Sequence, residues 1–174
     1  MNTDSILSTL TSVLANSWWG PIHLVGYLIG FFLVISGLVR LANMHRGRDG
    51  LATAILRIVS GILLLNLMSF LNVLSQSTFG ENAPTSALEY APSSSGSTGI
   101  EMQFVYVCIE IIGLIGIIRG LVLMAGAASE PRNTGRAFTH IIGGILALNM
   151  TSLLAVIGVT LGSSVNSAIQ RFIH

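Results

Sequence analysis

The strongest constraint on the fold is an internal repeat. A shift of 83 residues superposes residues 54–74 on residues 137–157 without a gap. Among the identical pairs are three that are not aliphatic: Gly61 and Gly144, Asn66 and Asn149, Ser69 and Ser152. The same shift aligns the preceding apolar stretch, in which it superposes Gly30 on Gly113, Gly37 on Gly120 and Ala42 on Ala125. Self-similarity at a fixed spacing indicates a duplicated unit, here two apolar segments joined by a short polar loop.

The composition places this duplicated unit in a membrane. Of the 174 residues 52% are hydrophobic and only 9% are charged, whereas about a quarter are charged in soluble domains. Four stretches, 22–43, 51–74, 102–127 and 137–161, are long enough to cross about 30 Å of hydrocarbon as helices. We therefore predict an all-α membrane protein with four transmembrane helices, arranged as two tandem parallel helical hairpins.

The chain divides into five segments on this interpretation. They are an amphipathic, interfacial N-terminal segment (1–20), the first hairpin (21–76), a polar Ser/Gly linker (77–101), the second hairpin (102–162) and a C-terminal tail (163–174). In the first segment the apolar residues Ile6, Leu10, Val13 and Leu14 recur at helical spacing, which predicts a short helix lying in the membrane interface. The segment lacks the features of a secretory signal, so we expect it to be retained.

The distribution of arginine predicts the orientation. Arg46 and Arg48 lie in the loop 43–50, and Arg132 and Arg136 lie in the loop 129–136, whereas residues 75–101 contain glutamates and no basic residue. By the positive-inside rule both loops are cytoplasmic, and the termini and the linker lie on the periplasmic side. The two hairpins then have the same orientation. Inverted repeats and interrupted helices are typical of transporters, and neither is expected here.

Small and amide residues predict how the helices pack. Glycines allow two helix backbones to approach closely in lipid, and the candidates are Gly26, Gly30, Gly61, Gly116, Gly120 and Gly144. Asn66 and Asn149 are placed in mid-span, each followed three residues later by a serine on the same helical face. We favour an interhelical hydrogen bond that fixes register over a solute-binding role for these two residues.

The basic residues near the loops suggest a lipid site. All eight basic side chains are arginine, and its planar fork suits phosphate groups. The candidates for binding a lipid phosphate are Arg40, Arg57, His140 and Arg119. The alternative is that most of these residues only set the topology. Arg119 and Glu110 both lie within the third span, about 13.5 Å apart along a helix, so we expect each to need a neighbouring subunit, a lipid headgroup or an aqueous lumen. The alternative for Arg119 is that its side chain only extends to the cytoplasmic end of the span.

Signals of catalysis are weak throughout the sequence. The four histidines are scattered, no carboxylate pair or metal-ligand spacing is found, and the single cysteine, Cys108, lies in an apolar run. We therefore expect a non-enzymatic protein without a metal, for which phospholipid is the one small molecule implied. The expected partners are membrane lipids and further copies of the chain.

The second helices of the two units read RIVSGILLLN and HIIGGILALN. With the preceding helix and the arginine-bearing loop, each unit resembles the hairpin of TrbC-type conjugative pilins, and the chain resembles two such hairpins fused. Its length and four spans are also similar to the small polytopic membrane proteins of type IVB secretion systems, which include the Dot/Icm apparatus and the TraQ-like proteins of IncI plasmids.

This resemblance implies a structural subunit of a conjugation or type IV secretion apparatus in the bacterial inner membrane. Such a subunit self-assembles with phospholipid into a filament or conduit for DNA or protein, in contact with other secretion components. Arg46, Arg48, Arg132 and Arg136 would then line the lumen or remain in cytoplasmic loops. The alternatives are a fixed inner-membrane component of the secretion channel and a holin-like or small channel protein.

Overall fold

The computed structural model describes residues 3–17, 19–43, 50–80, 97–130 and 132–161. Over these residues the chain folds into helices, which confirms the all-α prediction. The helices are α1 (Thr3–Ser17), α2 (Trp19–Ala42), α3 (Leu51–Leu65), α4 (Leu67–Phe79), α5 (Ser97–Gly126), α6 (Arg132–Leu148) and α7 (Met150–Leu161).

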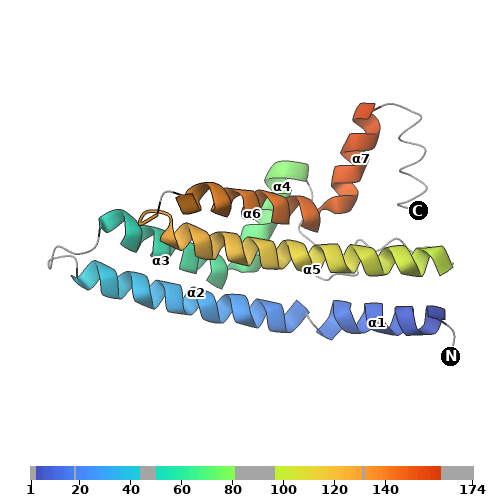
Figure 1. Ribbon diagram of the computed structural model, residues 1–174, viewed down its shortest axis with the longest axis horizontal. Helices are drawn as coiled ribbons and strands as arrows, with labels where there is room; N and C mark the ends of the chain where they lie inside the picture. The colour runs from blue at the N-terminus through green and yellow to red at the C-terminus, as the bar shows by residue number, and fades with distance from the viewer. Residues whose placement is uncertain (1–2, 18, 44–49, 81–96, 131, 162–174) are drawn as a thin grey trace.

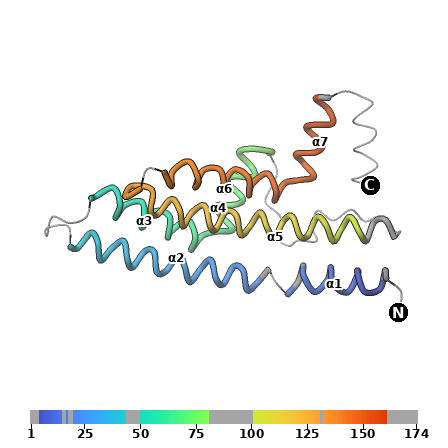
Figure 2. Tube along the Cα trace, in the orientation of Figure 1, coloured from blue at the N-terminus to red at the C-terminus, as the bar shows by residue number. Residues whose placement is uncertain are grey.

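The helices pack as two pairs that lie against each other. α2 packs along α3 to form the first pair, α5 packs along α6 to form the second pair, and α3 contacts α5 between them. Figures 1 and 2 show that α2 and α5 run in the same direction. Consequently the last turns of α2 and α5 and the first turns of α3 and α6 lie at one end of the molecule, which we call the connection end.

Glycines bring the helices of each pair into backbone contact. A Cβ atom added to Gly61 would lie 2.7 Å from the carbonyl oxygen of Gly30, and one added to Gly144 would lie 2.6 Å from that of Gly113. Real Cβ atoms essentially never come within 3.0 Å of such a neighbour. Because the two glycine pairs are related by the 83-residue shift, the duplication in the sequence is also a duplication of packing.

A second close contact repeats seven residues away on each helix. A Cβ atom on Gly37 would lie 3.1 Å from the carbonyl oxygen of Ala54, and one on Gly120 would lie 3.0 Å from that of Ala137. Each helix of the two pairs thus has two small residues seven positions apart: Gly30 and Gly37, Ala54 and Gly61, Gly113 and Gly120, Ala137 and Gly144. A spacing of seven keeps successive contacts on one face of a packed helix.

The second apolar segment of each repeat is broken at its asparagine, so the prediction of continuous helices over 51–74 and 137–161 is wrong. α3 and α4 meet at 90° around Asn66, and α6 and α7 meet at 84° around Asn149. The side-chain amide of each asparagine donates to a carbonyl four residues earlier, at 3.2 Å and 3.0 Å. Asparagine competes in this way with the helical backbone, which favours a helix end over a continuous helix.

The breaks correct two further expectations. Asn66 and Asn149 stand at helix ends, and the serines that follow them belong to the next, bent helix. The expectation that no helix is interrupted was also wrong. Of the two features that distinguish this chain from a typical transporter, only the common direction of the two pairs remains.

Two helices, Gly20–Ala42 and Glu101–Gly126, are long and apolar enough to cross a membrane, and there are up to four spans if each bent pair is one span. These helices are consistent with a membrane protein. α3 has 15 residues and α6 has 17, which correspond to about 22 and 25 Å of helix. Both are shorter than the hydrocarbon core of about 30 Å.

The N-terminal helix packs on protein as well as presenting an apolar face. α1 lies against α5, where Thr11 is 2% exposed and Leu14 packs against the core. Ile6, Leu10 and Val13, which the sequence placed on the apolar face, are 43–45% exposed. The helix therefore turns a different face to the protein and leaves these three side chains open.

Helices extend into both ends of the predicted linker. α4 continues to Phe79 and ends at Gly80, whose φ of 76° is left-handed, and α5 begins at Ser97. The remaining linker residues, 81–96, and the predicted tail, 163–174, lie outside the described residues.

Candidate functional site

The basic residues of α6 form a row along one face. Arg132, Arg136 and His140 are spaced four apart, which places them on the same side of the helix. Both arginines are exposed and His140 is half-buried, with its Nδ1 atom 2.8 Å from the carbonyl oxygen of Arg136. Cations near a helix N-terminus oppose the helix dipole. Arg132, the first residue of α6, therefore gains nothing from the dipole of its own helix, which favours a role toward an anionic group outside it.

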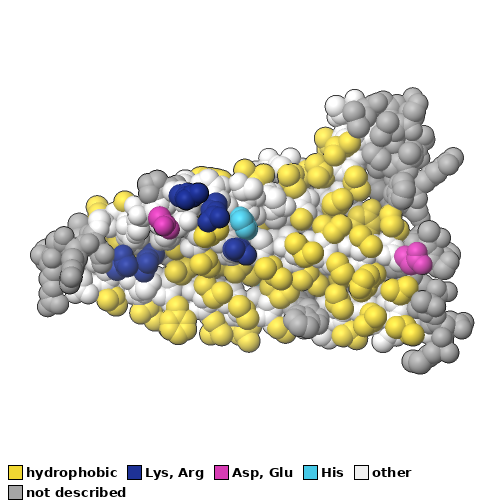
Figure 3. All heavy atoms as spheres, viewed as in Figure 1, with side chains coloured by type: hydrophobic (Ala, Val, Ile, Leu, Met, Phe, Trp, Pro, Cys, Tyr) yellow, Lys and Arg dark blue, Asp and Glu magenta, His cyan; other side chains and the backbone are white. Residues whose placement is uncertain are grey.

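Arg119 joins this row from the neighbouring helix. It is exposed on α5, one turn after Gly116, and a Cβ atom on Gly116 would lie 3.5 Å from the carbonyl oxygen of His140. Figure 3 shows that arginine side chains and a histidine gather in the half of the molecule nearer the connection end, while hydrophobic side chains cover much of the face shown. We call Arg119, Arg132, Arg136 and His140 the basic row.

The four residues predicted to bind a lipid phosphate all lie toward the connection end. Each of Arg40, Arg57, Arg119 and His140 is within eight residues of the helix terminus at the connection end. Arg119 and His140 lie on neighbouring helices of the second pair, whereas Arg40 and Arg57 are half-buried on the first pair. Arg46 and Arg48 lie outside the described residues.

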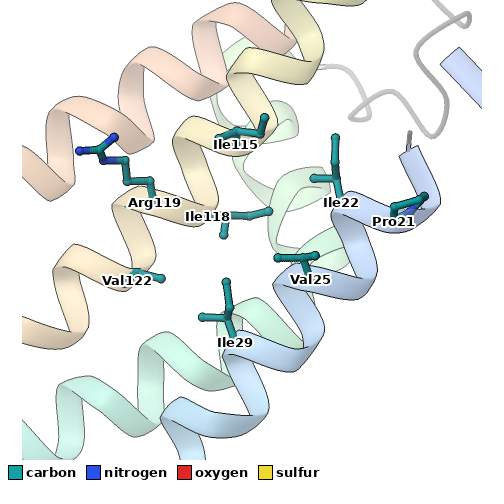
Figure 4. A pocket seen from close by; sticks show the side chains of 8 residues that line it. All are labelled: Pro21, Ile22, Val25, Ile29, Ile115, Ile118, Arg119 and Val122. Carbon is teal, nitrogen blue, oxygen red and sulfur yellow. The ribbon is translucent and has the colours of Figure 1, made fainter. Parts of the chain in front are cut away.

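An apolar groove runs between α2 and α5 beside Arg119. Its volume is about 470 Å³, and Figure 4 shows its lining: Pro21, Ile22, Val25, Ile29, Ile115, Ile118, Arg119 and Val122. The guanidinium of Arg119 points away from α2, so only its aliphatic stem borders the groove. A groove of this kind fits hydrocarbon, with a cation at one side for an anionic head.

Comparisons with models of known protein families, with curated protein sequences and with solved structures found no match.

The two equivalent asparagines have different surroundings. Asn149 is fully buried, and its amide donates to Oγ of Ser75 at 3.0 Å, which joins the second repeat to the first. Its Oδ1 atom has no hydrogen-bond partner among the described residues. Asn66 is exposed and borders a hollow of about 360 Å³ that also involves His23 and Tyr27.

Glu110 lies inside the single chain. It is 3% exposed, on the face of α5 that also carries the buried Val107 and Leu114. The expectation that this carboxylate needs a neighbouring subunit, a headgroup or a lumen is therefore wrong, because α1 and α3 pack against α5. No group of three or more potential metal ligands occurs in the described part of the chain.

The predicted packing glycines fall into two groups. Gly30, Gly61, Gly120 and Gly144 make the close contacts within the pairs, whereas Cβ atoms on Gly26 and Gly116 would have ordinary contacts of 3.4 and 3.5 Å. Gly37 and Gly113, which also make close contacts within the pairs, were not among the packing glycines predicted from the sequence. The alignment of the two repeats contained the signal, because it superposes Gly37 on Gly120 and Gly30 on Gly113.

Proposed function

We propose that this chain is a non-enzymatic membrane protein with four spans, in which each repeat crosses the bilayer twice and the bent pairs α3 with α4 and α6 with α7 each form one span. In this proposal the chain assembles with copies of itself and with phospholipid as a structural subunit of a conjugation or type IV secretion apparatus. The common direction of α2 and α5 and the repeated glycine contacts support two parallel hairpins. The apparatus is inferred from the resemblance of the two second helices to pilin hairpins.

The observation that carries the lipid part of the proposal is the position of the basic row beside apolar surface. Arg119 and His140 lie seven and eight residues from the helix termini at the connection end. The long aliphatic stem of Arg119 can extend its guanidinium toward the headgroup level. The groove between α2 and α5 offers apolar lining for an acyl chain next to Arg119. An anionic phospholipid matches both features.

The orientation follows from charge. The connection end carries the basic residues of α5 and α6, so we place it in the cytoplasm. In an assembled filament or conduit Arg132 and Arg136, with Arg46 and Arg48, would face the lumen.

Lipid analysis tests the binding proposal. The chain is purified in mild detergent and the phospholipid that remains bound is quantified by mass spectrometry. The variant Arg119→Gln/Arg136→Gln/His140→Gln should lose most of the bound phosphatidylglycerol, whereas Thr134→Ala/Thr139→Ala, with exposed neutral residues on the same helix, should retain it. Equal retention by the two variants would contradict the basic row as the lipid site.

Deletion of the gene in a donor strain tests the proposed apparatus. Transfer of a conjugative plasmid or a secreted protein should fall by orders of magnitude and recover on complementation. Electron microscopy of sheared surface material then separates the two forms of the proposal, because full-length filaments in the deletion strain would indicate a fixed inner-membrane component. Unchanged transfer, or collapse of the membrane potential on overexpression, would favour a small channel.

A further inference from the structure

The two helix pairs meet through unlike faces. α3 and α4 of the first repeat lie against α5 and α6 of the second. Ser60 and Leu64 of α3 are at most 1% exposed, and Leu114 and Leu121 of α5 are fully buried. Because the pairs are repeats of each other, α6 carries the residues equivalent to the buried face of α3, and α2 carries the residues equivalent to the buried face of α5.

The α2 version of the α5 face is open. The five α5 residues Val107, Glu110, Leu114, Ile118 and Leu121 are 0–8% exposed. The 83-residue shift relates them in order to Leu24, Tyr27, Phe31, Ile35 and Leu38, which are 42–60% exposed. These five side chains recur on one side of α2, and we call them the open α2 face.

The α6 version of the α3 face is open as well. Ser60 and Leu64 correspond to Gly143 and Ala147. A Cβ atom on Gly143 would meet nothing within 4 Å, and a hollow of about 260 Å³ extends over Gly143, Ala147 and Gly116. The face that the first repeat buries against α5 is therefore exposed in the second repeat.

The bent helices follow the same pattern. α4 reaches the second repeat, where Ser75 accepts the hydrogen bond from the buried Asn149. α7 leaves α6 at 84°, close to the 90° between α3 and α4. The counterpart of Asn149 is the exposed Asn66, which borders an open hollow. Gly158, the counterpart of Ser75, departs from the pattern, because it is buried in the single chain and has no hydroxyl.

We propose that a second copy of this chain docks α6 and α7 on the open α2 face of the first, repeating the contact that α3 and α4 make with α5 inside one chain. The inference rests on the self-association in the proposed function and identifies its surface. The contact joins two different faces, so it is heterologous, and successive copies form a ring if the rotation closes and a filament if it does not. Because the two pairs run in the same direction, every copy keeps the same orientation in the bilayer.

A cysteine pair tests this contact. Within one chain, a Cβ atom on Gly26 of α2 would lie 3.4 Å from Cδ1 of Ile118 of α5. The shift converts this pair into Ile109 of one copy and Ile35 of the next. Gly26 and Ile118 lie at the same level on the parallel helices α2 and α5. In a single chain Ile35 follows Gly26 by nine residues and Ile109 precedes Ile118 by nine residues. Ile35 and Ile109 are therefore about 27 Å apart along the helices and cannot form an intrachain disulfide.

In a Cys108→Ser background, oxidation of Ile35→Cys/Ile109→Cys in native membranes should give a ladder of covalent multimers, and neither single variant should do so. If the ladder is absent but a general crosslinking reagent still gives oligomers, the proposed surface is wrong and the chain nevertheless self-associates. A chain that is monomeric with both reagents would overturn both. Dimers from Ile35→Cys alone would indicate a two-fold contact and would also overturn the inference.

Gly143→Leu provides the matched disruption. The substitution places a side chain in the open hollow, so it should leave the fold intact and reduce the ladder at least tenfold. Folding is checked with the intrachain disulfide between Thr53→Cys and Ser129→Cys, whose parent hydroxyls are 3.4 Å apart. A full ladder from Gly143→Leu would contradict the proposed docking of α6.

Discussion

Adjacent glycines in α6 have opposite surroundings. Gly144 packs on the backbone of α5, and Gly143, the next residue, points into open space. Only the first of these two positions requires the absence of a side chain. The equivalent of the contact between Gly144 and Gly113 is the contact between Gly61 and Gly30 in the first repeat, so Gly61 also requires the absence of a side chain.

Gly144→Ala should therefore destabilise the protein by about 1–3 kcal/mol, because the added methyl group would lie 2.6 Å from the carbonyl oxygen of Gly113 and overpacking of this size costs that much. Gly143→Ala is the control and should be neutral or slightly stabilising, since alanine favours the helix over glycine. The free energy of unfolding in detergent or bicelles is the measurement. Equal effects of the two substitutions would contradict the close packing of α5 on α6.

The hydrogen bond between Ser75 and Asn149 joins the repeats at one atom pair. Ser75→Ala should lower the free energy of unfolding by about 0.6 kcal/mol and by less than about 2, which is the range for such bonds in membranes. Ser77→Ala is a suitable control, because its exposed hydroxyl donates to the Val73 carbonyl of its own helix. A larger loss in Ser77→Ala would place the stabilising contact elsewhere.

At the scale of whole helices, hydropathy and the repeat predicted the apolar helical segments, and the structure added the breaks. The average hydropathy over 51–74 is dominated by leucine and isoleucine, so it does not reveal the effect of Asn66, the amide residue at which α3 ends. The alignment of Asn66 with Asn149 was visible, but its effect on the backbone depends on a side-chain bond to the carbonyl four residues earlier.

α1 illustrates a second limit. Its apolar residues allow more than one face to be the buried one, and the choice depends on how α5 fits against the helix. Thr11 satisfies its own hydroxyl by donating to the Leu7 carbonyl at 2.8 Å, which lets a polar residue occupy the buried position. The candidate basic residues were named from the sequence, whereas the apolar groove beside Arg119 arises only when α2 and α5 are placed together.

The contact between α3 and the end of α5 gives a prediction for element packing. Thr53 Oγ1 and Ser129 Oγ are 3.4 Å apart, so Thr53→Cys/Ser129→Cys in a Cys108→Ser background should form an intrachain disulfide on mild oxidation. The product is a monomer with altered mobility on a non-reducing gel. Pairing of Thr53→Cys with Glu101→Cys, at the opposite end of α5, should give none, and its formation would contradict the arrangement of the two pairs.

For the whole molecule, the two pairs act as units that point the same way. Asn43 follows α2 and Ala128 follows α5, and both residues are exposed at the connection end, whereas Glu101 is exposed near the start of α5. If the bilayer crosses the pairs along their length, the first two residues lie on one side of it and the third on the other.

Cysteines at positions 43 and 128 should accordingly react with a membrane-impermeant maleimide only after the cytoplasmic side is opened. A cysteine at position 101 should react in cells whose outer membrane alone is permeabilised. The three variants share the Cys108→Ser background. Labelling of positions 43 and 128 from different sides would exclude the parallel arrangement.

The shared direction of α2 and α5 also bears on how such a gene could arise. A tandem copy of one hairpin segment has the same orientation in the bilayer as its parent. The basic residues of its loop therefore already lie on the correct side, and no loop charge had to change for the duplicated protein to insert. Glycine contacts inside each copy could then stay fixed while the outward surfaces diverged. The outward surfaces have diverged in this chain, since Ser60 and Leu64 of the first repeat are replaced by Gly143 and Ala147 at the equivalent positions of the second.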